Sequence, residues 1–451
     1  MLDELHARVE GRVIGPDDED YDRARAVFYG GFEGVKPSVI VRAAGPADVS
    51  TVVTFARDRG VELAVRSGGH SPAGHGTTDG GIVLDLGELK GLEIDADRRT
   101  AWAETGLTAL EVSTAAAKHD LAIGFGDTGS VGIGGITLGG GVGYLVRKQG
   151  LTIDSLLAAE IVTADGETHL VDEDHEPDLF WAIRGGGGNL GVATRFRYRL
   201  HELPGIVGGM LILPASPEVI AGFMAEAEGA PEELSAIANV MVAPPLPFLP
   251  PEAAGSLVLM ALMCFAGDAE AGERALAPFR SLATPIVDQL RPMPYPEIYP
   301  PEDDSYHPTA AGRTMFLDRV DLGTAETIVE RLQASDAVVR VTQLRTLGGA
   351  MARVPAEATA FAHRSSRIMA NVAAFYEGEA DRPAKQAWVD GSAEALQQGD
   401  QGAYVGFLVE EGEERVRAAY PGSTWDRLAE VKRRYDPTNV FRRNQNVPPA
   451  A

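Results

Sequence analysis

A histidine follows two glycines in the segment RSGGHS, residues 66–71. Neutral imidazole carries a lone pair that can attack an electrophile, and the ordinary pKa of histidine leaves a substantial neutral fraction near pH 7. His70 can therefore act as a nucleophile, or it can be a structural residue that only forms hydrogen bonds. The spacing of the residues leaves both interpretations open.

A second segment, GSVGIGGITLGGGVGYL at residues 129–145, is very rich in glycine. Glycine weakens the interior of a helix or strand, so this density needs a reason, and close approach of the main chain to a large ligand is the usual one. Backbone N–H groups exposed in this way suit a pyrophosphate. The two segments together predict a site where the main chain closely approaches a large ligand that carries a pyrophosphate.

Other chemistries have less support. Gly186, Gly188 and Gly191 satisfy GxGxxG, but here a predicted helix precedes the motif and a strand follows, the reverse of a dinucleotide fingerprint. A tight turn near another ligand is favoured over an NAD site. His70 and His75 have no further His or Cys nearby to complete a metal site, so no metal is predicted. The sequence contains neither a GxSxG elbow nor a P-loop.

The composition of the chain excludes some classes of binding partner. The chain has 451 residues and a net charge of −25, which argues against nucleic-acid binding. No apolar run is long enough for a membrane helix, and the first residues lack the pattern of a secretory signal, so a cytoplasmic protein without membrane partners is expected. The lone cysteine, Cys264, lies in an apolar segment and is expected to be buried.

The elements that position the histidine form a β-α-β unit. A strand at 38–42, a helix opened by Pro46 and closed by Gly60, and a strand at 61–66 place RSGGHS at a strand's C-terminal end, where open α/β sheets hold ligands. Further short strands separated by Gly and Asp indicate an α+β fold. In residues 192–200 apolar and basic side chains alternate, which predicts a half-solvated strand.

The pattern changes near residues 203–209, after which longer strands and helices predict a second α+β domain. The proline-rich stretch 291–308 is predicted to be a surface loop that could rim a pocket. Residues 403–410 read as a strand, and a helix is expected after Ser423. The predicted boundaries are 1–205 for the first domain, 206–402 for a substrate domain, and 403–451 for a segment that returns to the first domain.

Four stretches, residues 65–86, 129–167, 177–201 and 435–449, together resemble the berberine bridge enzyme-like flavoproteins of the p-cresol methylhydroxylase and vanillyl-alcohol oxidase superfamily. The resemblance covers nearly the whole chain, with its motifs in family order. It implies a bipartite FAD domain of the p-cresol methylhydroxylase type. Within it stands an inserted α+β substrate domain, whose antiparallel sheet covers the isoalloxazine.

The resemblance also implies roles for residues. His70 matches the histidine that bonds to the flavin 8α carbon, within the loop Arg66, Ser67, Gly68, Gly69 and Ser71. The implied cradle for the pyrophosphate and ribityl chain is Gly129, Ser130, Gly134, Gly135, Thr137 and Gly141. Ile161 and Val162 match the adenine edge, and Val192 and Asn444 match further flavin contacts.

Two departures from the family pattern matter. Many relatives attach the flavin a second time through a cysteine where this chain has Thr128, so no cysteinyl link is expected. Many sugar-oxidising relatives carry YxNY, whose last tyrosine is the base, whereas this chain has Tyr404, Val405, Gly406 and Phe407. The remaining candidates for a catalytic group are Tyr404, His363, Asn371 and Tyr376, each of which can instead be a packing or sheet residue.

The expected activity is hydride transfer from a C–OH or C–N bond of a small, secondary-metabolite-like substrate to FAD, with O2 reoxidising the flavin to give hydrogen peroxide. Two alternatives stay open. The protein can be a flavoprotein that protects against or sequesters a toxic reduced compound. It can also be a dehydrogenase that does not use O2.

Overall fold

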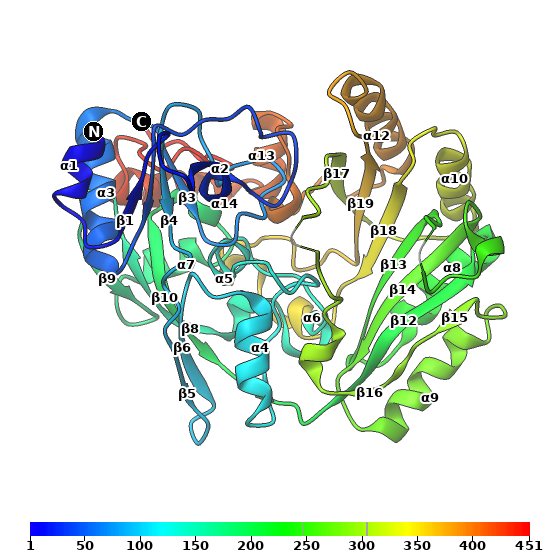
Figure 1. Cartoon of the computed structure of the whole chain (residues 1–451). Helices are drawn as coiled ribbons and strands as arrows, with labels where there is room; N and C mark the ends of the chain where they lie inside the picture. Colours follow the sequence, from blue (N-terminus) through cyan, green and yellow to red (C-terminus); the bar gives the residue numbers. More distant parts are fainter. Residues whose placement is uncertain (246, 304) are drawn as a thin grey trace.

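Residues 1–202 contribute two main sheets, and a larger third sheet stands opposite them (Figure 1). The structure is a computed structural model that describes residues 1–245, 247–303 and 305–451. Helices and antiparallel sheets are mixed throughout, so the predicted α+β class is confirmed.

The first sheet has the strand order β1-β2-β4-β3, in which β2, β4 and β3 are parallel and β1 is antiparallel to β2. Helix α3 begins with Pro46 at its first turn and ends at Gly60, which has a φ of 63°. Both ends lie where the sequence predicted them, and the predicted β-α-β unit is confirmed. The elements of this layer are α1 (Leu2–His6), β1 (Arg12–Ile14), α2 (Tyr21–Arg25), β2 (Val39–Arg42), α3 (Pro46–Arg59), β3 (Leu63–Arg66) and β4 (Ile82–Asp85).

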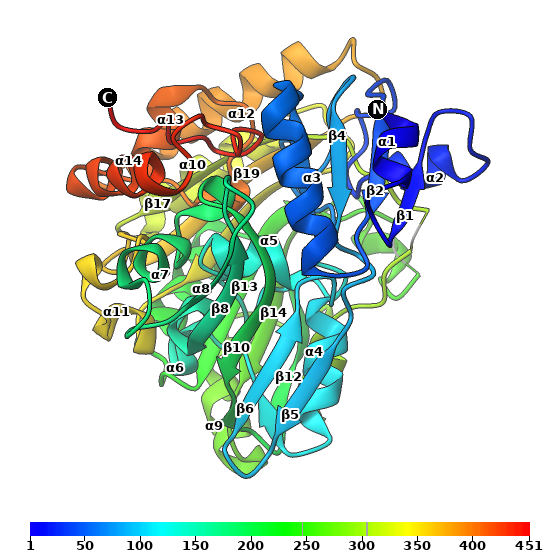
Figure 2. The same cartoon turned by 90° about the vertical axis from the view of Figure 1, so that its left-hand side faces the viewer.

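The second sheet is antiparallel, with the order β5-β6-β10-β8-β9, and its strand β10 carries the predicted alternation of buried and partly exposed residues. Figure 2 shows this sheet beside α3. The elements of this part are β5 (Leu92–Asp95), β6 (Thr100–Glu104), α4 (Ala109–Ala117), β7 (Leu121–Ala122), α5 (Ile133–Leu138), α6 (Val146–Gln149), η1 (Thr152–Ser155), β8 (Leu156–Val162), β9 (Thr168–Val171), α7 (Pro177–Ile183), η2 (Gly187–Asn189), β10 (Val192–Arg199) and β11 (His201–Glu202).

The third sheet has the order β15-β12-β14-β13-β18-β19-β17, with β16 also paired to β12. Its strands are β12 (Ile206–Pro214), β13 (Leu234–Val242), β14 (Leu257–Phe265), β15 (Val287–Asp288), β16 (Arg291–Met293), β17 (Ala310–Leu317), β18 (Arg340–Thr346) and β19 (Ile368–Phe375). Its helices are α8 (Pro217–Gly229), η3 (Pro251–Ala253), α9 (Ala269–Arg280), η4 (Tyr295–Ile298), α10 (Leu322–Gln333), α11 (Ala350–Arg353), η5 (Ala356–Ala358) and α12 (Arg382–Leu396).

Helices α8, α9, α10 and α12 pack on the side of the third sheet that faces away from the first two sheets (Figure 1). The buried residues between these helices and the sheet form one hydrophobic cluster drawn only from the span 207–396. That separate core agrees with a substrate domain over 206–402, and the division of the chain into domains stays a prediction. The opposite face of the third sheet faces the first part of the chain.

The C-terminal residues return to the first part, where both termini lie (Figure 1). Helix α14 (Ser423–Tyr435) packs against α7, and α13 (Glu413–Ala419) precedes it. The prediction of a strand over 403–410 is wrong, because the structure has the short turn η6 (Val405–Phe407) there. The backbone N–H of Phe407 donates to the carbonyl of Tyr404 at 3.0 Å, and this turn directs the apolar side chains into a cavity instead of a sheet.

The prediction of a surface loop over 291–308 is only partly right. β16 pairs with β12 at its start, and Tyr295 and Tyr299 are buried in the core. Residues 301–303 are exposed as expected, and residue 304 lies outside the described residues. Across the described ranges, no helix is both long enough and apolar enough to cross a bilayer. Cys264 is buried, as predicted.

Candidate active site

The two glycine-rich segments touch each other. A β-carbon on Gly68 would lie 2.2 Å from the backbone nitrogen of Gly132, and one on Gly132 would lie 2.2 Å from the nitrogen of Gly68. No side chain fits at such a distance, so glycine is required at both positions. Ser67 joins the same contact, since its Oγ donates to the carbonyl of Thr105 at 2.6 Å and accepts from the N–H of Gly134 at 3.2 Å.

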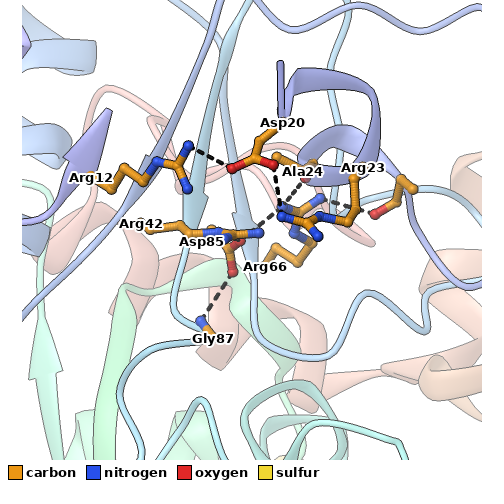
Figure 3. A network of polar contacts seen from close by, with 9 residues as sticks. Arg12, Asp20, Arg23, Ala24, Arg42, Arg66, Asp85 and Gly87 are labelled. Atoms are coloured by element: carbon orange, nitrogen blue, oxygen red, sulfur yellow. Dashed lines mark hydrogen bonds and ion pairs between the residues drawn. The ribbon is translucent and has the colours of Figure 1, made fainter. Parts of the chain in front are cut away.

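Arg66, at the end of β3, anchors the start of the RSGGHS loop. Its buried guanidinium lies 2.9 Å from the carboxylate of Asp85 and also donates to the carbonyls of Ala24 and Ala26. Asp85 in turn accepts from Arg42 and from the N–H of Gly87, as Figure 3 shows. Buried charges need such partners, and here the pair fixes the strand end from which the histidine loop departs.

The segments enclose a cavity of about 1770 Å³, counted with the open space at its mouth. Glycines of three turns form much of its wall, and aromatic side chains from both ends of the chain complete it. A β-carbon on Gly135 would meet no atom within 4 Å, so the backbone at this glycine is open to the cavity. The predicted cofactor residues that line the cavity are Arg66, Ser67, Gly68, Gly69, His70, Ser71, Gly134, Gly135, Val192 and Asn444.

His70 lies at the wall of this cavity. Its ring stacks on Phe28 with centroids 4.1 Å apart and planes 20° apart, and its Nε2 lies 2.9 Å from the Oγ of Ser130. Burial lowers the pKa of His70 to about 4, and the charge of Glu302 opposes this shift. The imidazole is therefore neutral at pH 7 and retains a lone pair, as a nucleophile requires.

The turn GGGNLG lies against the same cavity. Gly187, Gly188 and Gly191 line it, and α7 precedes the turn while β10 follows. The structure shows a tight turn beside the cavity, with the helix and strand in the order that excludes a dinucleotide fingerprint, and a ligand against this turn stays a prediction. Asn189 ties the turn to the C-terminal segment, because its Nδ2 donates to the carbonyl of Gln445 at 3.1 Å.

Two polar atoms in the wall of the cavity fit a polar ligand. Asn444 donates through Nδ2 to the carbonyls of Gly188 and Phe441, both at 3.0 Å, while its buried Oδ1 has no partner among the described residues. The buried hydroxyl of Tyr420 is likewise without a partner there. Buried polar atoms are usually hydrogen-bonded, so these two atoms indicate that a ligand supplies the missing partners. The residues present therefore fit a large polar cofactor such as FAD.

The other predicted cofactor residues lie behind the wall. Thr137 is buried and bonds to the hydroxyl of Tyr198 at 2.8 Å, and the N–H of Gly141 donates to the hydroxyl of Tyr404 at 3.3 Å. Ile161 and Val162 lie on β8, paired with Ala193 and Val192 of β10. Gly129 and Ser130 lie in the turn before α5, and Ser130 faces a second, smaller cavity on which His70 also borders.

Of the four candidates for a catalytic group, Tyr404 lines the main cavity. Its hydroxyl is buried, which raises its pKa, so the phenol stays protonated at neutral pH. His363, Asn371 and Tyr376 are not among the described residues that line the cavity. His363 is buried against Phe316 with Nε2 3.1 Å from the carbonyl of Ala419.

Asn371 lies within the third sheet, between Thr314 and Gln343 of the neighbouring strands. Tyr376 follows the end of β19 and packs on the helix-covered core of that sheet.

Sequence reasoning missed a polar chain on the third sheet. Arg345 of β18 is buried, and its Nη2 lies 2.6 Å from the Oδ2 of Asp127, a cavity residue next to Thr128. Its Nε donates to the side chain of Gln343 at 2.9 Å, and its guanidinium lies 5.0 Å from the centre of the Phe407 ring. The signal was the alternation in VVRVTQLR, which places Gln343 and Arg345 on one face of a strand.

Comparisons with known proteins agree with this geometry. Residues 37–172 match the family described as FAD binding domain, and residues 403–448 match the family described as berberine and berberine like. The chain is 31% identical to (R)-6-hydroxynicotine oxidase of Paenarthrobacter nicotinovorans, covering 98% of this chain and 97% of that protein. It is 30% identical to an uncharacterized FAD-linked oxidoreductase of Bacillus subtilis, YvdP, covering 98% and 99%.

Among solved structures, 6-hydroxy-D-nicotine oxidase from Arthrobacter nicotinovorans superposes with a TM-score of 0.88 at 28% identity, covering 98% of both chains. The likeness therefore extends over nearly the whole fold.

Proposed function

Because this chain belongs to the berberine bridge enzyme-like family of FAD-linked oxidoreductases, we propose that it oxidises a C–OH or C–N bond of a small molecule, using an FAD bound covalently to His70. One observation carries the proposal: a neutral histidine with one engaged ring nitrogen stands in the wall of a glycine-lined cavity. A covalent link to FAD, a cytoplasmic location and the use of O2 rest on the sequence as predictions.

Several groups of the protein would hold the cofactor. The backbone at Gly135, near the start of α5, is open to the cavity and suits the phosphates. The Oδ1 of Asn444 has no partner among the described residues and offers an acceptor for a ring N–H. When bound, FAD accepts a hydride from the substrate and passes the electrons to O2. The protein holds the substrate carbon against the cofactor and keeps water out of the cavity.

A C–N bond is favoured over a sugar hydroxyl. Oxidation of an alcohol needs a base for the O–H proton, and Phe407 stands where sugar-oxidising relatives have the basic tyrosine. Tyr404 is held protonated by burial, so it does not replace that base at neutral pH. A neutral amine needs no such base, and the relative named 6-hydroxynicotine oxidase supports a nitrogen-containing substrate.

The tether is tested by denaturing the purified yellow protein. We expect the flavin to remain on the denatured wild-type chain and to be released from His70→Ala. His75→Ala is the matched control, because His75 also lines the cavity and should leave the tether intact. A wild-type sample whose flavin washes out in acid would contradict the covalent link.

The class of reaction is tested by screening amines, alcohols and sugars for anaerobic bleaching of the flavin. Bleaching by an amine, followed by rapid recovery of the yellow colour in air, is the result expected of an amine oxidase. Bleaching that persists in air until a dye is added would indicate a dehydrogenase. Tight binding without bleaching would indicate a protein that sequesters its ligand.

A further inference from the structure

Three residues from distant parts of the sequence form a chain of hydrogen bonds that ends at His70. Nε2 of His70 lies 2.9 Å from the Oγ of Ser130, and the same hydroxyl contacts Oε2 of Glu302. The backbone N–H of Ser130 donates to the other carboxylate oxygen, Oε1, at 2.9 Å. Glu302 belongs to the exposed segment after η4 of the third-sheet part, so it reaches this loop from the other half of the molecule.

The direction of these bonds fixes the tautomer of the histidine. An ionised carboxylate only accepts hydrogen bonds, so the Ser130 hydroxyl donates its proton to Glu302. The oxygen of Ser130 must then accept from His70, which places the imidazole proton on Nε2. The lone pair is left on Nδ1, which has no hydrogen-bond partner among the described residues.

We infer that Ser130 and Glu302 form a proton relay that activates His70 for its bond to the flavin, an inference that rests on the proposed covalent link. Nδ1 of His70 forms a C–N bond to the 8α carbon, and the 8α methyl loses one proton. The Nε2 proton passes through Ser130 to Glu302. The two electrons released reduce the flavin, and O2 reoxidises it with two protons to give hydrogen peroxide.

The relay follows the logic of a base that is oriented by a third group. Attack through Nδ1 leaves positive charge on the imidazole, and loss of the Nε2 proton removes it. Ser130 and Glu302 both border the second cavity, and neither is among the described residues that line the main cavity. The relay therefore contacts the histidine without occupying the main cavity, where the cofactor would bind. Glu302 reaches His70 through the hydroxyl of Ser130.

The test follows the tethering of FAD by apoprotein over time, using intact mass and flavin fluorescence in denaturing gels. We expect Glu302→Gln and Ser130→Ala to tether FAD at least tenfold more slowly than wild type, within the range for loss of a proton acceptor. Non-covalent FAD binding, measured by fluorescence quenching, should be retained in Glu302→Gln, because Glu302 is not among the predicted cofactor contacts. Ser130→Thr keeps the hydroxyl and should restore tethering. Asp303→Asn changes a neighbouring carboxylate at the same cavity and is the matched control.

A second measurement uses the unaltered protein. Nitrogen-15 NMR of histidine-labelled apoprotein, with His70 assigned by its loss in His70→Ala, should report the proton on Nε2. A proton on Nδ1 would overturn the relay, as would Glu302→Gln and Ser130→Ala variants that tether at the wild-type rate. A wild type that never tethers FAD would overturn the covalent link itself and the relay with it.

Discussion

Arg345 of β18 and Asp127 of the loop before α5 form an ion pair of 2.6 Å that joins the third sheet to the wall of the cavity. Arg345 is 4% exposed, so its end of the pair is held away from water. Asp127 lines the cavity, so the pair connects the third sheet directly to the cavity wall.

Replacing Arg345 by Met should lower kcat/KM by tenfold or more, because the partly buried carboxylate of Asp127 loses its partner at the wall of the cavity. The flavin content should be unchanged, since Arg345 lies outside the predicted cofactor contacts. Steady-state kinetics and flavin content are the measurements. Arg319→Met is the control, because the Arg319–Asp321 pair is largely exposed and should contribute little.

Tyr404→Phe should change kcat less than tenfold, because burial keeps the phenol protonated and unsuited to accept a proton. The unfolding free energy should fall by about 1 kcal/mol, since the N–H of Gly141 loses its acceptor. Rapid-reaction kinetics and denaturant unfolding measure the two effects. A hundredfold loss of kcat at unchanged KM would instead identify Tyr404 as the base. Tyr376→Phe, away from the cavity, should leave kcat unchanged.

Lys432→Met should destabilise the protein by about 3–5 kcal/mol. The ammonium is fully buried, 2.8 Å from Asp436, and donates to the carbonyls of Asn189 and Phe441, both at 2.7 Å. Its removal leaves the Asp436 carboxylate uncompensated and loosens the C-terminal segment from the turn GGGNLG. Denaturant unfolding measures the loss. The neighbouring exposed pair Arg433–Glu430 gives the control, and Arg433→Ala should cost under about 0.5 kcal/mol.

Stability should fall as the pH drops from about 6.5 toward 4. Burial, with the charge of Arg443, lowers the pKa of His75 to about 4, so the unfolded chain binds a proton in this window that the folded chain does not. More protons bound by the unfolded state means that the unfolding free energy rises with pH.

Between pH 8 and pH 5, the unfolding free energy should fall by about 2 kcal/mol less in His75→Gln than in wild type. Denaturant unfolding at both pH values measures it. His119→Gln, at an exposed site, is the control. An unchanged slope in His75→Gln would show that His75 does not carry the effect.

The sequence predicted the local features of the site well. The RSGGHS loop follows a strand, as predicted, and the glycine run packs against it. The close contact between Gly68 and Gly132 leaves no room for a side chain, so the glycines in the sequence indicate it. The rejection of a dinucleotide fingerprint at Gly186–Gly191 followed from the order of helix and strand, which local periodicity reveals.

Long-range relationships were beyond the sequence. Glu302 and Ser130 are 172 positions apart, and Arg345 and Asp127 are 218 apart, so no local sequence pattern predicts either contact. The apolar spacing in residues 403–410 resembles a strand, yet in the fold these side chains fill the cavity wall. The alternation of apolar residues is visible in a single sequence, but whether those residues pair in a sheet or line a cavity is not.

Tyr404, Leu408, Tyr420 and Asn444 complete a chamber that Phe28 and the histidine loop also line. During synthesis on a ribosome, the histidine loop emerges long before these closing residues. Loading of the flavin is thereby deferred until translation has nearly finished, so nascent chains stalled before residue 403 should be colourless even when the cofactor is plentiful.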